Sequence, residues 1–459
     1  MLVAGVDSST QSTKVVLCQA EDGAVLGVGS APHPGGTQCD PQAWWDALLA
    51  AGDGLLDQAS AIGVAAQQHG MVTLDEAGQV VRPALLWNDV RSAPQAAELI
   101  AELGGPGEWA SRTGSVPTAA FTVTKLRWLA EREPAHAART SLVALPHDWL
   151  TWRLGGRAAD GPATDRGDAS GTGYFSPSGG GWERGLAKAA LGHDVELPRL
   201  AAPAGVVGHT PAGAVLSAGT GDNMAAALGL GLRAGDVAVS VGTSGTAYAV
   251  TERPSADPTG AVAGFADATG RFLPLVCTLN AARVLTVTAD LLGTDTGELS
   301  ALALAAKPGA GGLTLLPYLD GERTPNRPDA TGVLSGLTTA SGTRENLARA
   351  AVEAVLCSLA DAIDHLAGVG LAPRRVLLIG GGARSEAIRV LAPGILGAEV
   401  LVPEPAEYVA LGAARQAAWA LAGSAEPPSW PTAPAASYTG DPVPAVRERY
   451  AALRDATAP

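Results

Sequence analysis

With 459 residues, the chain exceeds the ~250–300 residues that one hydrophobic core usually supports, so we expect two domains. Its 45 acidic and 31 basic residues give a net charge of −14, which argues against a nucleic-acid partner or an anionic membrane surface. No uncharged apolar stretch reaches the ~18–20 residues of a membrane span, and the first residues lack a signal-peptide pattern. The four cysteines are isolated, which predicts reduced thiols and a cytoplasmic location: Cys18, Cys39, Cys277 and Cys357.

The amino-terminal segment, LVAGVD and then STKVVLCQAEDGAVLGVG, contains apolar runs that predict three strands joined by tight turns. The first turn is rich in small residues, which let backbone N–H groups and hydroxyls approach a phosphate closely. The candidate phosphate-binding residues there are Ser9, Thr10, Gln11, Ser12, Thr13 and Lys14. Asp7 ends the first strand, where a carboxylate either bonds its own backbone or anchors hydrated Mg²⁺ beside phosphates.

A helix is expected from Asp40 onward, because aspartate is a good N-cap and proline fits the position that follows it. Residues 62–66 predict a buried strand, and two polar segments follow. Their amide, imidazole, indole and carboxylate groups form a set suited to a polyol: Gln68, His69, Trp87 and Asp89. Each group also has an ordinary interpretation, since a lone histidine is more often structural and residues 87–89 could form a plain loop.

Further along the chain, residues 92–152 have mainly helical patterns. Residues 154–181 are rich in Gly, Asp, Ser and Thr and predict excursions over the surface. Residues 341–369 predict a long amphipathic helix. From about residue 424 the chain is proline-rich, and it closes with a helix-like pattern.

Asp222 follows a turn built of Gly219, Thr220 and Gly221 and precedes an apolar helical run. Aspartate is a good N-cap, and acids at such positions are mostly structural. A carboxylate there could also accept a hydroxyl proton while that oxygen attacks a phosphorus. The sequence leaves both roles open, and they are compatible.

A second turn of the same kind occupies residues 239–246, in the sequence VSVGTSGT. Aligning it with the first turn places Asp7 over Ser240 and Thr10 over Thr243. The pair predicts a nucleotide bound by two related domains, divided near Gly231 into residues 1–231 and 232–459. Candidate nucleotide contacts in the second half lie in this turn and in a glycine run after a strand: Gly242, Thr243, Ser244, Gly380, Gly381 and Gly382.

Together these segments resemble the FGGY carbohydrate kinases. The resemblance rests on GVDSSTQSTK, QQHGMV, LWNDVR, GTGDN, SVGTSGT, LPYLDGERTP and LLIGGGARSEAI, and it extends from Gly5 to Ala414. It implies an α/β fold of two actin-like (ribonuclease-H-like) ATPase domains flanking a central cleft. It also implies ATP and Mg²⁺, with sugar bound mainly by the first domain and ATP mainly by the second.

Residue roles follow from the same resemblance. Asp222 resembles the general base and Asp7 the metal-linked acid. Gln68, His69 and Asn223 resemble sugar contacts. The implied reaction is phosphorylation of a ketopentose, D-xylulose at its 5-hydroxyl being favoured. Kinases for another ketose or an alditol, and an actin- or chaperone-like ATPase, are the alternatives; the oligomeric state is open, a homodimer included.

Overall fold

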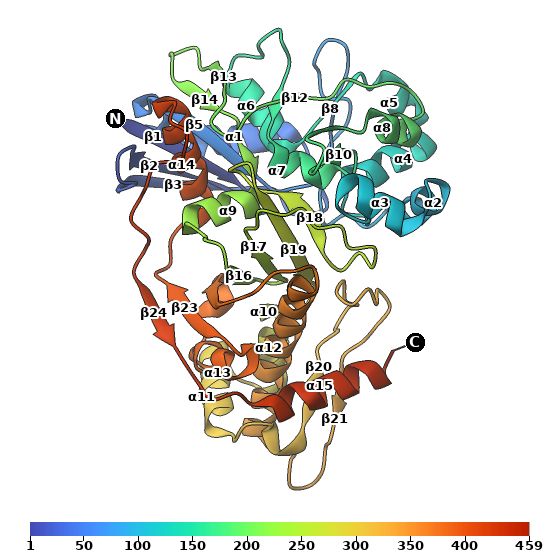
Figure 1. Ribbon diagram of the computed structural model, residues 1–459, viewed down its shortest axis with the longest axis vertical. Helices are drawn as coiled ribbons and strands as arrows, with labels where there is room; N and C mark the ends of the chain where they lie inside the picture. The colour runs from blue at the N-terminus through green and yellow to red at the C-terminus, as the bar shows by residue number, and fades with distance from the viewer. Residues whose placement is uncertain (459) are drawn as a thin grey trace. The chain divides into compact units, whose positions relative to one another are not determined.

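The structure, a computed structural model, describes residues 1–458 and divides into two compact units (Figure 1). The first unit comprises Met1–Leu232, Thr251–Leu273 and Ala406–Thr432. The second comprises Arg233–Val250, Pro274–Pro405 and the chain from Ala433 onward. The units are therefore not consecutive halves: a single cut after Gly231 would separate two later segments from the unit on which they pack.

The first unit is built on a mixed sheet in which β13, β14, β5, β1, β2 and β3 lie side by side in that order. β1, β2 and β3 are antiparallel, whereas β5 is parallel to β1 and β14 is parallel to β5. The prediction of three amino-terminal strands is confirmed. The strands of this sheet are β1 (Leu2–Ser8), β2 (Ser12–Gln19), β3 (Val25–Pro32), β5 (Ala61–Ala66), β13 (Val206–His209), β14 (Val215–Ser217) and β15 (Thr220–Gly221), which pairs with β5.

Helices and short strands complete this unit. Residues 92–152 are mainly helical, as predicted, with one short strand, β8. The remaining elements are β4 (Gln38–Cys39), α1 (Pro41–Ala51), η1 (Leu56–Gln58), β6 (Val72–Leu74), β7 (Ala84–Leu85), α2 (Ala93–Glu102), α3 (Gly105–Thr113), α4 (Thr122–Arg132), α5 (Pro134–Arg139), β8 (Leu142–Ala144), α6 (Pro146–Leu154), β9 (Ala163–Thr164), α7 (Arg166–Ala169), η2 (Ser170–Thr172), β10 (Phe175–Ser176), β11 (Gly181–Trp182), α8 (Arg184–Leu191), β12 (Arg199–Leu200), α9 (Asp222–Leu230), β18 (Ala263–Ala266) and α14 (Tyr408–Ala422).

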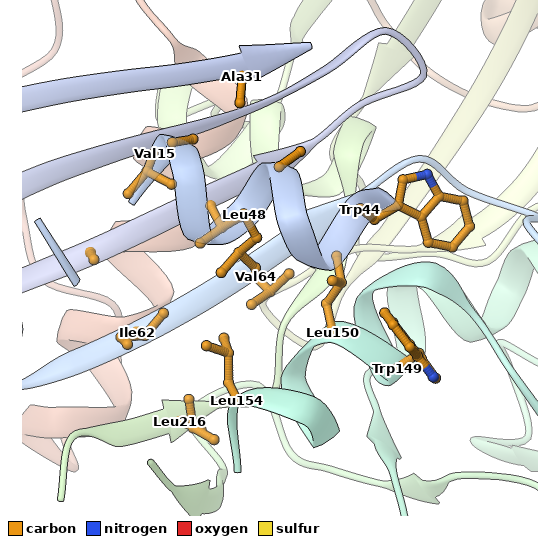
Figure 2. Packing of buried hydrophobic residues seen from close by; sticks show 14 of the residues in the cluster. Val15, Ala31, Trp44, Leu48, Ile62, Val64, Trp149, Leu150, Leu154 and Leu216 are labelled. Carbon is orange, nitrogen blue, oxygen red and sulfur yellow. The ribbon is translucent and has the colours of Figure 1, made fainter. Parts of the chain in front are cut away.

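An apolar core forms where α1 and α6 pack on the sheet (Figure 2). Helix α1 begins as predicted, since the Asp40 side chain accepts a hydrogen bond from the Gln42 backbone N–H at 2.9 Å. Trp44 and Leu48 then face the core, where both side chains are fully buried. Burial of such large side chains supplies most of the driving force that holds the helix on the sheet.

Helix α14 packs against β1, β5 and α9, although β1 and α14 come from opposite ends of the sequence (Figure 1). The contact is backbone on backbone. A Cβ on Gly5 of β1 would lie 1.9 Å from the carbonyl oxygen of Ala410, and one on Gly412 would lie 1.8 Å from that of Ala225. Only glycine permits so close an approach, so these residues fix where α14 lies.

The second unit repeats the strand order of the first. β19, β17, β16, β22, β23 and β24 lie side by side, and the first three of them are antiparallel. β22 is parallel to β16, β23 is parallel to β22, and β24 is antiparallel to β23. These are the relationships of β3, β2, β1, β5, β14 and β13, so the two related α/β domains that the sequence predicts are confirmed.

The predicted long helix is α12, which covers Arg344–Gly368. The strands of this unit's sheet are β16 (Asp236–Val241), β17 (Gly245–Ala249), β19 (Phe272–Thr278), β22 (Arg375–Ile379), β23 (Glu399–Pro403) and β24 (Ala435–Tyr438). The other elements are α10 (Ala282–Leu292), α11 (Thr296–Ala305), η3 (Ala310–Gly312), β20 (Thr314–Leu316), β21 (Val333–Ser335), α12, η4 (Gly381–Arg384), α13 (Glu386–Leu396) and α15 (Pro444–Ala456).

Candidate active site

The candidate base, Asp222, is the first residue of α9 and follows the short strand β15. Thr220 and Gly221 of β15 pair in parallel with the last two residues of β5. Gly219 allows the turn before this strand: its φ is 74°, and a Cβ would lie 2.5 Å from the ring of His147. The carboxylate therefore lies at the sheet edge where β5 ends and the polar segment 67–70 begins.

The side chain of Asp222 is held by its neighbour. Its Oδ1 accepts hydrogen bonds from the backbone N–H of Asn223 at 2.8 Å and from Asn223 Nδ2 at 2.9 Å. Asn223 Nδ2 also donates to Gln68 Oε1 at 3.2 Å. Gly221 is the N-cap residue of α9, so the N-cap interpretation of Asp222 is wrong. Burial raises the pKa of Asp222 to about 6, which suits a group that gains a proton near neutral pH.

Asp7 lies on β1, opposite Lys14 of β2. Its side chain is buried, and its Oδ1 has no hydrogen-bond partner among the described residues. Burial, and then the charge of Asp222, raises the pKa of Asp7 to about 7. Lys14 does not neutralise it by contact, since Lys14 Nζ forms an ion pair with Glu407 Oε2 at 2.6 Å. Glu407 was not predicted as a site residue, because it lies on the segment that returns to this unit late in the chain.

The turn 9–13 between β1 and β2 is held by two side chains from elsewhere in the unit. Thr13 Oγ1 bonds to His33 Nε2 at 2.8 Å. Thr10 Oγ1 accepts the indole N–H of Trp87 at 2.8 Å. The structure therefore places Trp87, a predicted sugar-binding residue, in contact with the predicted phosphate-binding turn. His33 was not predicted, since nothing in its local sequence indicates a contact with this turn.

Asp89 has protein partners on both carboxylate oxygens. It accepts hydrogen bonds from Thr37 Oγ1 at 2.8 Å and from Arg91, through the backbone N–H at 3.0 Å and Nε at 2.8 Å. Burial opposes ionisation, but these bonds outweigh it and lower the pKa of Asp89. Asp89 thus anchors the loop after β7, and its role as a sugar contact stays a prediction.

His69 lies at the end of the segment that follows β5 and adopts a backbone conformation that is rare outside glycine, with a φ of 66°. Its Nδ1 lies 2.6 Å from the carbonyl oxygen of Gly171. A carbonyl only accepts, so Nδ1 carries the proton of this hydrogen bond. The ring also packs against Phe121, with centroids 4.7 Å apart, and against Phe265, at 5.9 Å. The orientation of the imidazole is therefore fixed from several sides.

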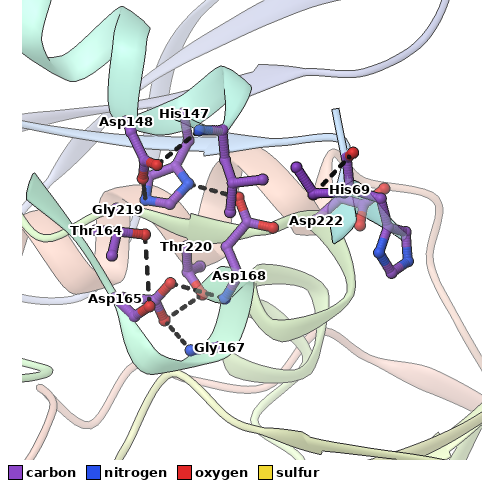
Figure 3. A network of polar contacts seen from close by, with 12 residues as sticks. His69, His147, Asp148, Thr164, Asp165, Gly167, Asp168, Gly219, Thr220 and Asp222 are labelled. Atoms are coloured by element: carbon purple, nitrogen blue, oxygen red, sulfur yellow. Dashed lines mark hydrogen bonds and ion pairs between the residues drawn. The ribbon is translucent and has the colours of Figure 1, made fainter. Parts of the chain in front are cut away.

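A buried charged network lies beside the base turn, which is the turn of residues 219–221 just before Asp222 (Figure 3). His147 Nδ1 bonds to Asp168 Oδ2 at 2.6 Å, and His147 Nε2 lies 3.1 Å from Asp148 Oδ1. Burial opposes the charged imidazolium, but Asp148 and Asp168 outweigh it and raise the pKa of His147 to about 9. Asp165 Oδ2 accepts a hydrogen bond from Thr220 Oγ1 at 2.8 Å. The network thus reaches the turn that carries Asp222.

The expectation that residues 154–181 run over the surface is wrong for the middle of that segment. Residues 163–164 and 167–175 are buried, and Asp165 begins α7 by accepting bonds from the backbone N–H groups of Gly167 and Asp168, at 2.8 and 2.9 Å. The polar side chains are buried because they bond one another and the backbone. In the sequence, the one indication of this structure was Asp165, which precedes a short helical pattern.

In the second unit, the turn 242–244 and the glycine run 380–382 lie close together. They follow β16 and β22, which pair in parallel with Ser240 opposite Ile379. A Cβ on Gly380 would lie 2.9 Å from the carbonyl oxygen of Val241, and one on Gly382 would lie 2.4 Å from the Val241 side chain. The structure brings these predicted nucleotide-binding segments together, with both glycines packed against Val241.

The donor set around Asp7 fits a hydrated Mg²⁺ ion. Within residues 1–458, no three His, Cys, Asp or Glu side chains cluster as a metal cage. Mg²⁺ at phosphate sites does not require such a cage, since it keeps several waters and uses one or two carboxylates together with phosphate oxygens. The buried, unpartnered Oδ1 of Asp7 is a hard oxygen of this type.

Comparison with known families gives matches over nearly the whole chain. The model for the N-terminal domain of the FGGY family of carbohydrate kinases matches residues 2–229, and that for its C-terminal domain matches residues 237–421. The chain is an FGGY carbohydrate kinase. The resemblance stated from the motifs is thereby confirmed, as is the phosphotransferase activity of the family.

Two relatives of this kinase illustrate the similarity. The chain is 50% identical to a xylulose kinase of Streptomyces coelicolor over 445 residues, which cover 92% of this chain and 88% of the relative. It is 37% identical to a xylulose kinase of Escherichia coli over 445 residues, which cover 90% and 89% of the two chains.

The fold of this kinase is similar to that of a crystal structure of xylulose kinase from Bifidobacterium adolescentis. The two have a TM-score of 0.92 and 47% sequence identity over 99% of each chain. Within residues 1–458, the kinase has no helix with the length and apolar character of a membrane span.

Proposed function

We propose that this kinase transfers the γ-phosphoryl group of ATP to the 5-hydroxyl of D-xylulose. The substrate is inferred from the relatives in Streptomyces coelicolor, Escherichia coli and Bifidobacterium adolescentis, each named xylulose kinase. The observation that carries the proposal is the contact of Asn223 with both Asp222 and Gln68. It joins the candidate base to the segment that carries the candidate sugar-binding groups.

In this mechanism Asp222 is the general base. The sugar hydroxyl oxygen forms a bond to the γ-phosphorus while the bond from that phosphorus to the β,γ-bridging oxygen breaks, and ADP leaves. The hydroxyl proton passes to the Asp222 carboxylate, whose pKa of about 6 leaves it mostly ionised at pH 7–8. Asn223 holds the accepting carboxylate in one orientation, while Gln68 and His69 bind sugar hydroxyls.

ATP is assigned to the predicted phosphate- and nucleotide-binding segments. In each unit, backbone N–H groups of the small-residue turn, 9–13 in the first and 242–244 in the second, would suit phosphate oxygens, and the glycine run 380–382 would suit the nucleoside. Mg²⁺, when bound, neutralises charge on the phosphate oxygens. Asp7 would hold it through water, since its buried Oδ1 is otherwise unpartnered.

The test is ADP release with MgATP against D-xylulose, L-xylulose, D-ribulose, L-ribulose, glycerol and no sugar. We expect strong turnover with D-xylulose and little with the others. Turnover with another sugar would keep the kinase chemistry and overturn the substrate. A rate of ADP release that is the same with and without each sugar would overturn the proposal and favour an ATPase that acts on another partner.

Two further proposals concern the state of the protein. A cytoplasmic location accords with the four cysteines, which are isolated along the sequence and buried. A homodimer is a prediction that analytical ultracentrifugation of the purified kinase would test.

A further inference from the structure

Lys125 is a fully buried lysine that the proposed mechanism does not use. It lies on α4, and none of its side-chain surface is exposed. Its Nζ donates to the carbonyl oxygen of His69 at 3.1 Å and to that of Ala120. A buried ammonium is costly, so a lysine that points inward to meet two carbonyl groups requires an explanation.

The carbonyl that Lys125 contacts belongs to a strained residue. His69 has a φ of 66°, in the left-handed region that residues with a Cβ adopt only when their surroundings impose it. The same carbonyl oxygen also accepts the hydroxyl of Thr122 at 3.2 Å. Two donors from the first turn of α4 therefore hold one peptide group in its unfavourable orientation.

Rotation of this peptide would move the imidazole, because the backbone of His69 sets the direction of its Cα–Cβ bond. At the far end of the residue, the ring is held by the Gly171 carbonyl and packed against Phe121. In the left-handed conformation the side-chain contacts and the backbone contacts are made together. If the backbone contacts were lost, the peptide group of His69 could rotate, and the imidazole would lose its fixed direction.

We propose that Lys125 is a positioning residue for the sugar site, which holds the His69 carbonyl and thereby fixes the direction of the His69 imidazole. This inference rests on the proposed role of His69 as a sugar contact. Burial lowers the pKa of Lys125 to about 7, with the carboxylate of Asp89 only partly offsetting it, so the lysine is retained at a cost to the folded state. That cost is expected of a group kept for function rather than for stability.

The experiment compares Lys125→Met with the wild type. Methionine fills a similar volume without donating, so we expect the KM for the sugar, and the sugar Kd measured calorimetrically without nucleotide, to rise about tenfold. The kcat and the KM for ATP should change less than about threefold. Lys188→Met, which removes an exposed lysine paired with Asp194, is the matched control and should change none of them.

A double-mutant cycle separates positioning from a general effect on the fold. In the His69→Ala background the imidazole is absent, so Lys125→Met should alter the sugar Kd by less than about twofold. An equal rise in both backgrounds would overturn the positioning role. An unchanged sugar Kd in His69→Ala alone would also overturn it, by removing His69 from the site, whereas failure of the wild type to turn over any sugar would instead overturn the proposed function.

If Lys125→Met fails to fold, Thr122→Val provides the second variant. It leaves the lysine in place and removes the other donor to the same carbonyl oxygen. We expect a rise in the sugar Kd of about threefold that likewise vanishes in the His69→Ala background. A sugar Kd equal to that of the wild type would overturn the proposal.

Discussion

Trp87 donates its indole N–H to Thr10 Oγ1 across 2.8 Å, which ties the segment after β7 to the turn between β1 and β2. The first segment carries predicted sugar contacts, and the turn carries predicted phosphate contacts. One hydrogen bond therefore connects the two sets of binding groups within a single unit.

Trp87→Phe should expose this connection, because phenylalanine keeps an aromatic face and removes the N–H donor. We expect kcat/KM for ATP to fall about three- to tenfold, the effect of one hydrogen bond, with a smaller change in the KM for the sugar. Thr10→Val should give a similar loss. The double variant should lose little more than either single one, and fully additive losses would show that the two residues act separately.

Asp222→Asn should keep the fold and lose about 10²–10⁴-fold in kcat, because the amide cannot accept the hydroxyl proton. Steady-state ADP release measures the loss, and calorimetry with ATP and with sugar checks that binding survives. Asp222→Glu is the matched variant, since it keeps a carboxylate and displaces it by one methylene. Turnover of Asp222→Asn close to that of the wild type would remove Asp222 from the mechanism.

Acid should inactivate the kinase through the same carboxylate. Burial raises the pKa of Asp222 to about 6, and the base acts only when ionised, so kcat should decline as the pH falls through about 6. The profile is measured with saturating sugar and MgATP between pH 5 and 9. A kcat that is constant down to pH 5 would contradict this assignment.

Asp7→Asn should stabilise the folded kinase at pH 8 while it impairs activity. The pKa of Asp7 is about 7 in the folded chain, above its ordinary value near 4, so the folded state binds the proton more tightly. The stability that this provides is complete below the ordinary pKa and is lost as the pH rises through about 7. Removing the charge should therefore raise the free energy of unfolding at pH 8 by about 1–3 kcal/mol, and have little effect at pH 4.

Thermal or urea unfolding at the two pH values checks this expectation. Asp53→Asn, which changes an exposed carboxylate, provides the control and should shift the unfolding midpoint little at either pH. If Asp7→Asn were less stable than the wild type at pH 8, Asp7 would have a stabilising partner in solution.

Thr220→Val should slow the reaction without weakening sugar binding. The variant keeps the shape of the side chain but loses the bond to Asp165, which joins the base turn to the buried network around His147. We expect kcat to fall about tenfold and the sugar Kd to stay within about twofold of the wild type. Thr286→Val, on the exposed face of α10, is the matched control; equal effects of the two variants would exclude a positioning role for Thr220.

The parts of the fold that depend on local patterns were predictable from the sequence. The strands around the first turn, the cap at Asp40 and the helix α12 follow from alternation, capping residues and helical periodicity. The repeat of two related sheets followed from the similarity of two turns. The position of α14 was not predictable, because it depends on close backbone contacts at glycines such as Gly5 and Gly412, which lie far apart in the sequence.

The same distinction holds for the site. The contacts among Gln68, Asp222 and Asn223 join two segments whose residue types predict sugar binding and proton transfer. Lys125 was missed, because the side chain of a lysine within a helix normally reaches solvent. The buried Asp168 was missed as well, since a composition rich in Gly, Asp, Ser and Thr indicates exposure unless the partners are known.

Gly412→Ala should destabilise the kinase strongly, because the added Cβ would lie 1.8 Å from the carbonyl oxygen of Ala225. We expect a loss of about 2–4 kcal/mol in the free energy of unfolding, or failure to accumulate folded protein. Gly185→Ala on α8 is the matched control: nothing lies within 4 Å of its added Cβ, and alanine should stabilise the helix by about 0.5–1 kcal/mol. Equal stability of the two variants would show that α14 moves away to accommodate the methyl group.

The packing of α14 on β1 and β5 also sets the order in which the kinase is completed during translation. Both strands have been made once the ribosome passes Ala66, yet the helix that covers them begins only at Tyr408. A nascent chain must therefore carry an uncovered glycine-rich sheet face while most of the remaining sequence is made. The first unit thus begins to fold early and is completed late. If a ribosome stalls before α14 emerges, this unit stays uncovered and is exposed to aggregation or proteolysis.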